Sequence, residues 1–362
     1  MAGAIFGGKW RVPEGDERTG RGPEVCLQVL SVRPEVLSVW QEVLSVALKG
    51  WRNGSATGCD GRMGVQRTAR LLEAGVTHRA LEASGRSGER VLVRHGAWSD
   101  EAPTDDLTRH RQLVEGTWPL LTGQAVLSHG TAAVLHGLPV WRALLERVSV
   151  TRSEGGHGTR TRHLHVRRAP LDRCEVTELD GYRVTSLERT AVDLAALLDY
   201  ERAVAVLDAA LHAKADATLM DALARAARNR RGAGVARRAL AFADGRAESV
   251  GESVSRVRMA QLGLPAPELQ FEVFDGNGLW IARVDFAWPD RGVVGEFDGA
   301  VKYTGSPKEV AVVVMQEKRR QQSIEEVGWR VVRWGFRDMD DRARFRERLA
   351  SALTLGSLRG TV

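Results

Sequence analysis

Cysteine is scarce in this 362-residue chain, which has only Cys26, Cys59 and Cys174. Three cysteines at wide spacing form neither a disulfide framework nor a zinc-binding set of cysteine and histidine. No apolar run approaches the roughly 18 to 20 residues that a membrane-spanning helix needs, and the longest valine-rich stretch covers only residues 310–315. These absences exclude a disulfide-stapled mini-protein, and they predict a cytoplasmic protein with no membrane partner.

Lysine is also scarce, because 46 of the 52 basic residues are arginine. Arginine forks onto phosphates and base edges, so this bias and the net charge of +6 are compatible with a nucleic-acid partner. GC-rich coding produces the same bias, so charge alone does not establish that partner. Hydrophobic residues at 43% and charged residues at 27% are typical of globular proteins. The length predicts two or three domains.

The first 62 residues differ from the rest of the chain. They show no steady helical or strand period, and the string EVLSV occurs twice. Residues 50–62, GWRNGSATGCDGR, resemble a translated transfer-RNA gene or its flank, and Met63 opens the first strongly patterned segment. We expect residues 1–62 to be a disordered leader or a mis-annotated start. The alternative is a short amphipathic helix over residues 25–48.

Residues 63–101 are patterned as two short helices followed by a hairpin. A helical run over residues 66–74 ends at Gly75, Thr77 caps a helix over residues 78–84, and residues 91–98 read as a strand, a turn and an aromatic residue. This order predicts a winged helix-turn-helix, in which the second helix enters the DNA major groove and the hairpin contacts phosphates. The candidate DNA contacts are Arg79, Arg86, Arg90 and Arg94. The alternative is a small helical cap with a solvated basic face.

Residues 102–221 mix helices and strands and are predicted to form an α+β scaffold. A helix opens at Ser128 and ends at Gly137, and Thr185 with Glu188 forms a capping box that opens a long amphipathic helix. Strands are expected at residues 147–151 and 163–167. Four histidines lack acidic partners at a metal-ligand spacing, so we interpret them as hydrogen-bonded or phosphate-facing. They are His129, His136, His163 and His165.

The winged pattern, the strings SHGTAA and HGL, and the string TSLERTAVDLA are together similar to the AbiEi family of antitoxins and transcriptional regulators. The resemblance covers about residues 66–214. It implies DNA binding at a promoter, and it allows a cognate toxin as a second partner.

Residues 222–244 are predicted to form a basic linker helix. The segment from residue 222 to 240 holds six arginines and no acidic residue. Arg228, Arg230 and Arg231 are candidate phosphate contacts. Such contacts make DNA affinity fall steeply with salt and carry no sequence information. The alternative is a solvated interdomain helix.

Residues 245–362 are patterned in the order αβββαβα. The sequence predicts helices over residues 248–262, 306–327 and 339–353, and strands over residues 269–274, 279–288, 293–297 and 329–334. A crossover helix between the third and fourth strands makes that pair parallel, and such sheets place functional sites at strand ends.

Acidic side chains gather at these strand ends. Asp285 leaves the second strand, Glu296 and Asp298 leave the third on one face because they are two residues apart, and Glu252 lies on the preceding helix. Converging carboxylates repel each other unless they are protonated or a cation neutralises them, and oxygen ligands suit Mg²⁺ or Mn²⁺. A cation held in this way supports phosphodiester hydrolysis. Lys302 would orient the attacking water or bind the phosphate.

The strings RVDFAW, GEFDG and EKRRQQSIEEVGWRVVRW resemble the PD-(D/E)XK nuclease superfamily, in the branch related to very-short-patch-repair endonucleases, over residues 248–336. The resemblance implies Asp285 and Glu296 as metal ligands, Glu252 as a helper through water, and Arg320 as a phosphate or carboxylate clamp. The family's third-strand lysine is replaced here by Asp298, and no histidine follows residue 212, which excludes a histidine base in this domain.

The alternative for this segment is that its acids pair with Arg283, Arg320 and Arg333, which would leave a DNA-binding or structural relic. The whole chain is therefore predicted to be an α/β multidomain protein that interacts with DNA. A restriction-endonuclease-like domain (residues 245–362) would hydrolyse phosphodiester bonds with Mg²⁺ or Mn²⁺. The alternative function is a non-catalytic AbiEi-type antitoxin or repressor. The sequence leaves open RNA as a partner, the target site and the oligomeric state.

Overall fold

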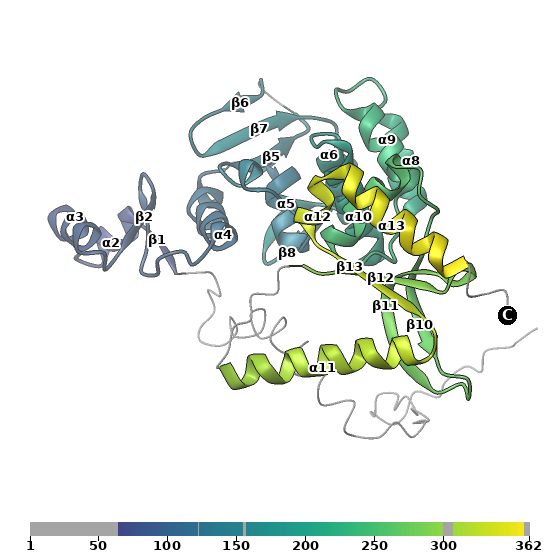
Figure 1. Cartoon of the computed structure of the whole chain (residues 1–362). Coiled ribbons are helices and arrows are strands. Elements are labelled where there is room, and N and C mark those ends of the chain that lie inside the picture. The colour runs from purple at the N-terminus through teal and green to yellow at the C-terminus, as the bar shows by residue number, and fades with distance from the viewer. Residues whose placement is uncertain (1–63, 122, 155–156, 300–306, 358–362) are drawn as a thin grey trace, which may run out of the picture. The chain divides into compact units, whose positions relative to one another are not determined.

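The computed structural model describes residues 64–121, 123–154, 157–299 and 307–357 (Figure 1). Its described elements form a mixed α/β fold with a three-stranded, a six-stranded and a four-stranded sheet, as the sequence predicts at this level. The predictions for residues 1–62, for a start at Met63 and for Lys302 lie outside the described residues. Within the described ranges, no helix has the length and apolar character that crossing a bilayer requires.

The first sheet has the strand order β1-β3-β2, and both strand pairs are antiparallel. Its elements are β1 (Val65–Arg67), α2 (Thr68–Glu73), α3 (His78–Ser87), β2 (Val91–Arg94) and β3 (Ala97–Ser99). The Thr77 hydroxyl accepts a hydrogen bond from the Ala80 N–H at 3.2 Å, so α3 begins where the sequence predicts. Gly85 lets α3 lie against Trp98, because a Cβ at this position would come within 2.9 Å of the indole ring.

The six-stranded sheet has the order β6-β7-β5-β4-β9-β8. Its strands are β4 (Val126–Leu127), β5 (Val148–Arg152), β6 (Thr159–Arg160), β7 (Leu164–Arg168), β8 (Val176–Leu179) and β9 (Tyr182–Thr185). The β5–β7 and β4–β9 pairs are parallel, and the other pairs are antiparallel. Helices α4 (Asp106–Thr117) and α5 (His129–His136) contact β5. Their apolar residues share a core with Leu127, Val150 and Val184.

Four helices follow this sheet: α6 (Leu187–Ala195), α7 (Tyr200–His212), α8 (Ala217–Ala226) and α9 (Ala233–Phe242). The predicted capping box is wrong, because Thr185 ends β9 and the Ser186 hydroxyl instead accepts the Arg189 N–H at 3.2 Å. The predicted long helix accordingly ends at Ala195, and a second helix begins at Tyr200.

The predicted basic linker helix is also wrong, because residues 222–244 contain the end of α8, a turn and α9. Gly232 has a positive φ of 82° at this turn, and a Cβ there would come within 1.8 Å of the Ala196 carbonyl oxygen. The apolar faces of both helices are buried through Ala224, Ala236 and Ala239, which pack in one core with α6 and α7. The segment is therefore part of a helical bundle.

The four-stranded sheet has the order β10-β11-β12-β13, and its β12–β13 pair is parallel. The elements are α10 (Val250–Gln261), β10 (Glu268–Phe274), β11 (Trp280–Trp288), β12 (Val293–Phe297), α11 (Pro307–Glu326), β13 (Arg330–Trp334), α12 (Phe336–Asp340) and α13 (Arg342–Ser357). The predicted order is present, except that Asp341 has extended backbone and divides the last helix into α12 and α13.

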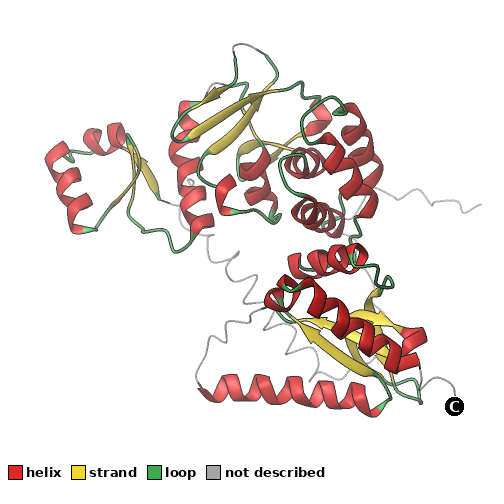
Figure 2. Ribbon diagram, turned by 45° about the horizontal axis from the view of Figure 1, so that its top comes forward, coloured by secondary structure: helices red, strands yellow, loops and turns green. Residues whose placement is uncertain are grey.

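Helices cover both faces of this sheet (Figure 2). α10 and α13 contribute Met259 and Leu349 to a core that also contains Trp334 and Phe286, whereas α11 contributes Ile324 to a separate core on Val284. Strand tryptophans are more often core residues than base-stacking residues, so we expect those of this domain to lie in the core. Trp288 and Trp334 are 2% and 1% exposed, as expected for core residues, whereas Trp280 is 46% exposed.

Candidate functional site

Asp285 and Glu296 lie on neighbouring strands of the four-stranded sheet. β11 and β12 pair antiparallel with Phe286 opposite Gly295, so one residue further along this register Asp285 lies across from Glu296. The backbone N–H of Phe297 donates to Asp285 Oδ2 at 2.8 Å, which holds this carboxylate at the end of β12. The fold therefore brings together two acids that the sequence separates, and like charges placed opposite each other destabilise a strand pair.

The electrostatics of Asp285 link it to two of the three other predicted acids, Glu252 and Glu296. Burial and the negative charges of Glu252 and Glu296 together raise the pKa of Asp285 to about 6. The Phe297 N–H and Arg320 favour the charged form but do not cancel the effect. Desolvation combined with specific charged neighbours is typical of functional sites.

Glu296 is held by two guanidinium groups. Its side chain is buried, Arg320 bonds to Oε1, and Arg333 on β13 lies 2.7 Å from Oε2. Arg333 is the register partner of Glu296 in the parallel β12–β13 pair. Arg320 therefore acts as a carboxylate clamp, one of its two predicted roles. The alternative, in which the acids pair with arginines, therefore holds for Glu296. Arg283 does not pair with these acids and instead forms an ion pair with Glu248 at 2.8 Å.

Glu252 is buried in the first turn of α10. Its Oε2 accepts hydrogen bonds from the Glu248 N–H at 2.9 Å and from Gln270 Nε2 at 2.8 Å. Gly251 lets this turn approach β12, because a Cβ there would come within 1.9 Å of the Phe297 ring. Sequence reasoning missed Gln270, since nothing in the local pattern of β10 distinguishes it from any other polar strand residue.

The carboxylates do not form the predicted three-ligand metal centre. Among the described residues, no group of three or more His, Cys, Asp or Glu side chains could hold a metal ion. Two arginines engage both oxygens of Glu296. Mg²⁺ is commonly bound through one or two carboxylates, with water and substrate phosphates as its other ligands. Asp285 and Glu252 are two carboxylates of that kind, and after burial the charge of Glu252 is the next largest cause of the raised pKa of Asp285.

Asp298, the other predicted acid of this domain, lies apart from Asp285 and Glu252. Asp298 is exposed, and its backbone N–H donates to the Trp334 carbonyl at 2.7 Å, which continues the pairing of β12 with β13. Its side chain is therefore exposed just after the end of β12.

Two of the four arginines predicted to bind DNA in the first module face solvent. Arg79 and Arg86 are exposed on α3, where only Leu81 is buried. Arg90 instead forms an ion pair with Asp100 at 2.8 Å. Arg94 donates to Thr117 Oγ1 at 3.0 Å, and its burial lowers its pKa. Arg90 and Arg94 are thus partly buried and paired with other residues of the protein.

The three arginines predicted in the linker lie at the turn between α8 and α9. Arg228, Arg230 and Arg231 are all exposed, although Arg230 lies 3.8 Å from an Asp193 carboxylate oxygen. They form a basic corner of the helical bundle.

Two of the scaffold histidines are hydrogen-bonded, which is one of the two roles expected for them from the sequence. His136 Nε2 is 2.8 Å from the Thr185 carbonyl, and His129 Nδ1 is 3.0 Å from the Ser128 hydroxyl. Sequence reasoning missed His110, which is fully buried between the Leu145 carbonyl and the Thr131 hydroxyl and whose pKa burial lowers to about 4.

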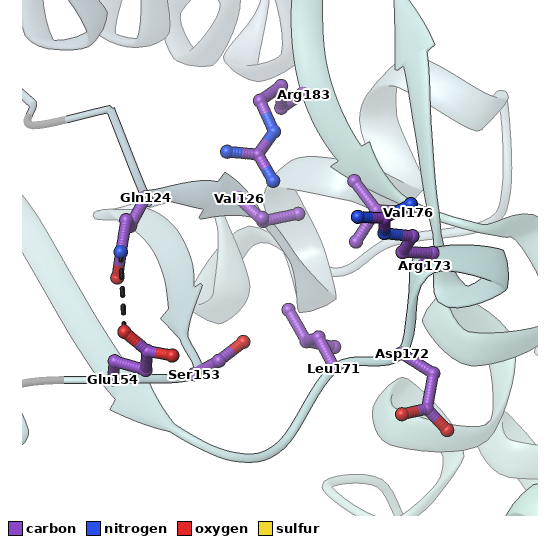
Figure 3. Close-up of a pocket in the computed structure, with 9 residues that line it drawn as sticks. All are labelled: Gln124, Val126, Ser153, Glu154, Leu171, Asp172, Arg173, Val176 and Arg183. Atoms are coloured by element: carbon purple, nitrogen blue, oxygen red, sulfur yellow. Dashed lines mark hydrogen bonds between the residues drawn. The ribbon is translucent and has the colours of Figure 1, made fainter.

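A groove of about 530 Å³ opens on the middle sheet, and no residue predicted from the sequence lines it (Figure 3). Val126, Leu171 and Val176 form its apolar part, and Gln124 and Glu154 meet at one side through a 3.4 Å hydrogen bond. The remaining charged lining residues are Asp172, Arg173 and Arg183. Two acids balance two arginines, so the groove favours neither an anionic nor a cationic ligand.

No protein-family model matches the chain. Two curated proteins of Mycobacterium tuberculosis are similar to it: "Uncharacterized protein Rv2248" of strain H37Rv and "Uncharacterized protein MT2308" of strain CDC 1551 / Oshkosh. Each is 34% identical over 260 residues, which cover 71% of this chain and 89% of the relative. The chain therefore belongs to the same family as these two mycobacterial proteins.

Proposed function

We propose that this chain is a DNA-binding protein whose first module is a winged helix-turn-helix. The observation that carries the proposal is α3, a ten-residue helix whose only buried residue is Leu81 and which displays Arg79 and Arg86 to solvent. Two helices between the first and second strands of a β1-β3-β2 sheet have the order of a winged helix. A mostly exposed second helix of this kind is suited to the DNA major groove.

The test is duplex binding by the full chain. Replacing Arg79 and Arg86 together by alanine should weaken binding at least tenfold at low salt and reduce the salt slope by about 2, since each phosphate contact contributes close to one unit. The matched control replaces Arg109 and Arg202, two exposed arginines paired with Asp106 and Asp199. This control removes the same positive charge from parts of the chain outside α3. Equal losses in both double variants would contradict a specific role for α3.

A second candidate function, phosphodiester hydrolysis, is favoured by the acidic set of the four-stranded sheet. Asp285 and Glu296 meet across β11 and β12, and Glu252 adds a third charge that Asp285 senses. A divalent ion held by Asp285 and Glu252 would polarise the phosphate and acidify a water molecule. Arg320 and Arg333 hold the Glu296 carboxylate in position. The αβββαβ order and the resemblance to PD-(D/E)XK nucleases support this candidate.

Supercoiled plasmid with Mg²⁺ or Mn²⁺ tests this candidate. The wild-type chain should nick the plasmid, and Asp285→Asn should lose at least 100-fold of the rate. Asp290→Asn, an exposed acid in the turn after β11, is the matched control and should retain the activity. Binding without nicking would remove hydrolysis and support the alternative of a non-catalytic AbiEi-type regulator. In that case a toxin partner becomes the further question.

A further inference from the structure

The hairpin of β6 and β7 forms one edge of the six-stranded sheet, and no described strand pairs with the outer side of β6 (Figure 1). Arg160 of β6 pairs antiparallel with His165 of β7. The turn between the strands is closed by the Thr161 N–H, which donates to the Leu164 carbonyl at 2.8 Å, and by the Thr161 hydroxyl, which accepts the Leu164 N–H at 3.2 Å. Residues 162–163 therefore form the tip of a tight hairpin.

The strand register divides this hairpin into an apolar face and a basic face. Leu164 and Val166 pack in the core of the middle sheet. Side chains alternate along a strand, so His165 and Arg167 lie on the opposite face of β7. Arg160 lies on that face as well, because residues directly opposite each other in an antiparallel pair project to the same side. The face turned away from the core is therefore basic.

No acidic residue of the hairpin balances these cations. Residues 155–171 contain four arginines and three histidines but no aspartate or glutamate. In the described part of the chain, no carboxylate lies within ion-pair distance of Arg160 or Arg162, and both arginines are exposed. Glu146, which precedes β5, is engaged by Arg147 at 3.0 Å. The two exposed guanidinium groups are thus available to an external anion.

The partly buried histidines of the hairpin lie in the same positive potential. Burial lowers the pKa of His165, and the charges of Arg167 and Arg160 lower it further. Burial also lowers the pKa of His163, and the charge of Arg162 is the next cause. The charges that act on both rings are those of arginines, which agrees with the basic face that the strand register defines.

The side chains around the hairpin select among polyanionic partners. Proteins that bind single-stranded nucleic acids stack the bases on aromatic side chains, and residues 142–181 contain no Phe, Tyr or Trp. Membrane surfaces and protein partners are held by apolar anchors beside the charges. None of the exposed large hydrophobic side chains in the described ranges lies on β5, β6 or β7. The backbone of a duplex requires neither feature, because arginine and threonine side chains bind its phosphate oxygens directly.

We propose that the basic face and the tip of the β6–β7 hairpin bind the phosphate backbone of duplex DNA, with Arg160 and Arg162 as the contacting residues. The inference rests on the proposed function for its partner, and it adds a second contact surface on the middle sheet. Contacts of this kind strengthen binding and set the orientation of the protein on the duplex, but they do not read the sequence.

The test measures binding of the full chain to a labelled random-sequence duplex of about 30 base pairs, or three helical turns, by fluorescence anisotropy over a series of KCl concentrations. Replacing Arg160 and Arg162 together by glutamine should weaken binding at least tenfold at low salt and reduce the salt slope by about 2, since each phosphate contact contributes about 0.9. Replacing both by lysine keeps the charges, so this variant should retain the wild-type slope. The control is the double variant of Arg109 and Arg202, which should bind as the wild type does.

The outcomes separate this inference from the proposed function. No duplex binding by the wild type would overturn both. If the variant of Arg79 and Arg86 loses binding while the glutamine variant of the hairpin binds as the control does, only the hairpin contact is overturned. The reverse result would support the hairpin and remove the role of α3.

Two further measurements test the choice of partner. A glutamine variant that loses binding to single-stranded DNA or to phosphatidylserine vesicles, but not to the duplex, would overturn duplex DNA as the partner. Unchanged duplex binding together with new self-association would overturn the proposal too, because charged side chains on an edge strand also prevent pairing between sheets.

Discussion

Asp285→Asn should stabilise the protein at neutral pH, which is unusual for a change at a buried polar residue. Folding moves the carboxyl from 3.8 to a pKa of about 6, because burial and then the charges of Glu252 and Glu296 disfavour ionisation. This difference of about 2 units corresponds to about 3 kcal/mol at 1.36 kcal/mol per unit. Asparagine keeps an oxygen that can accept the Phe297 N–H, so the substitution mainly removes the charge.

The pH dependence gives the sign of this effect. The folded state holds the Asp285 proton more tightly than the unfolded state does, so the wild-type free energy of unfolding falls as pH rises from about 4 to about 6. Above that range the whole penalty is present, and below it both states are protonated and no penalty remains. Asp285→Asn should therefore be more stable than the wild type by about 2–3 kcal/mol at pH 8 and nearly equal to it at pH 4.

Urea unfolding at several pH values measures this difference directly. Asp290→Asn is the control, since its exposed carboxylate lies outside the acidic set and should change the free energy of unfolding by less than about 0.5 kcal/mol. Equal stability of Asp285→Asn and wild type at pH 8, or a lower stability that does not change with pH, would refute the shared environment of the three acids.

Three further predictions follow from the same sheet. At pH 8, Mg²⁺ at millimolar concentration should raise the unfolding temperature of the wild type but not of Asp285→Asn, and equal shifts measured by calorimetry would contradict the proposed ligand role. Glu296→Gln should cost about 2–4 kcal/mol in urea unfolding, because it leaves two guanidinium groups without their buried counter-charge. Gly295→Ala should cost about 1–3 kcal/mol, because its Cβ would come within 2.4 Å of the Trp334 ring. Gly276→Ala, which meets nothing within 4 Å, is the control for this change, and equal losses would contradict the packing argument.

Local signals account for the parts of the fold that the sequence predicts well. The cap at Thr77, the turn residues 275–278 and the strand patterns around them act over a few residues, and the observed helices and strands follow them. The predicted capping box at Thr185 was wrong because it, too, rested on a local signal alone. Two residue types at the right spacing cannot reveal that Thr185 is the last residue of β9, or that its hydroxyl bonds to the Thr190 hydroxyl.

The basic linker shows how composition misleads. Six arginines in 19 residues led to the prediction of a basic linker helix, yet the alanines between them occupy helical positions that face a core. Alanine contributes little to a hydrophobic pattern, so a small-residue helix face is hard to recognise before its partner helices are known. The six arginines themselves are exposed, and Arg228, Arg230 and Arg231 lie at the turn between α8 and α9.

The amino-acid sequence by itself determined the order of the elements from α10 to β13, the position of Glu296 near the end of β12 and the place of Arg79 on the second helix of the first module. These follow from local periodicity and turn chemistry. Only the tertiary structure decided that Arg320 and Arg333 hold Glu296, that Gln270 supports Glu252, and that Arg189 pairs with Glu175. Each of these contacts joins residues from different elements. Strand register and helix packing set such contacts, and no short window of sequence contains them.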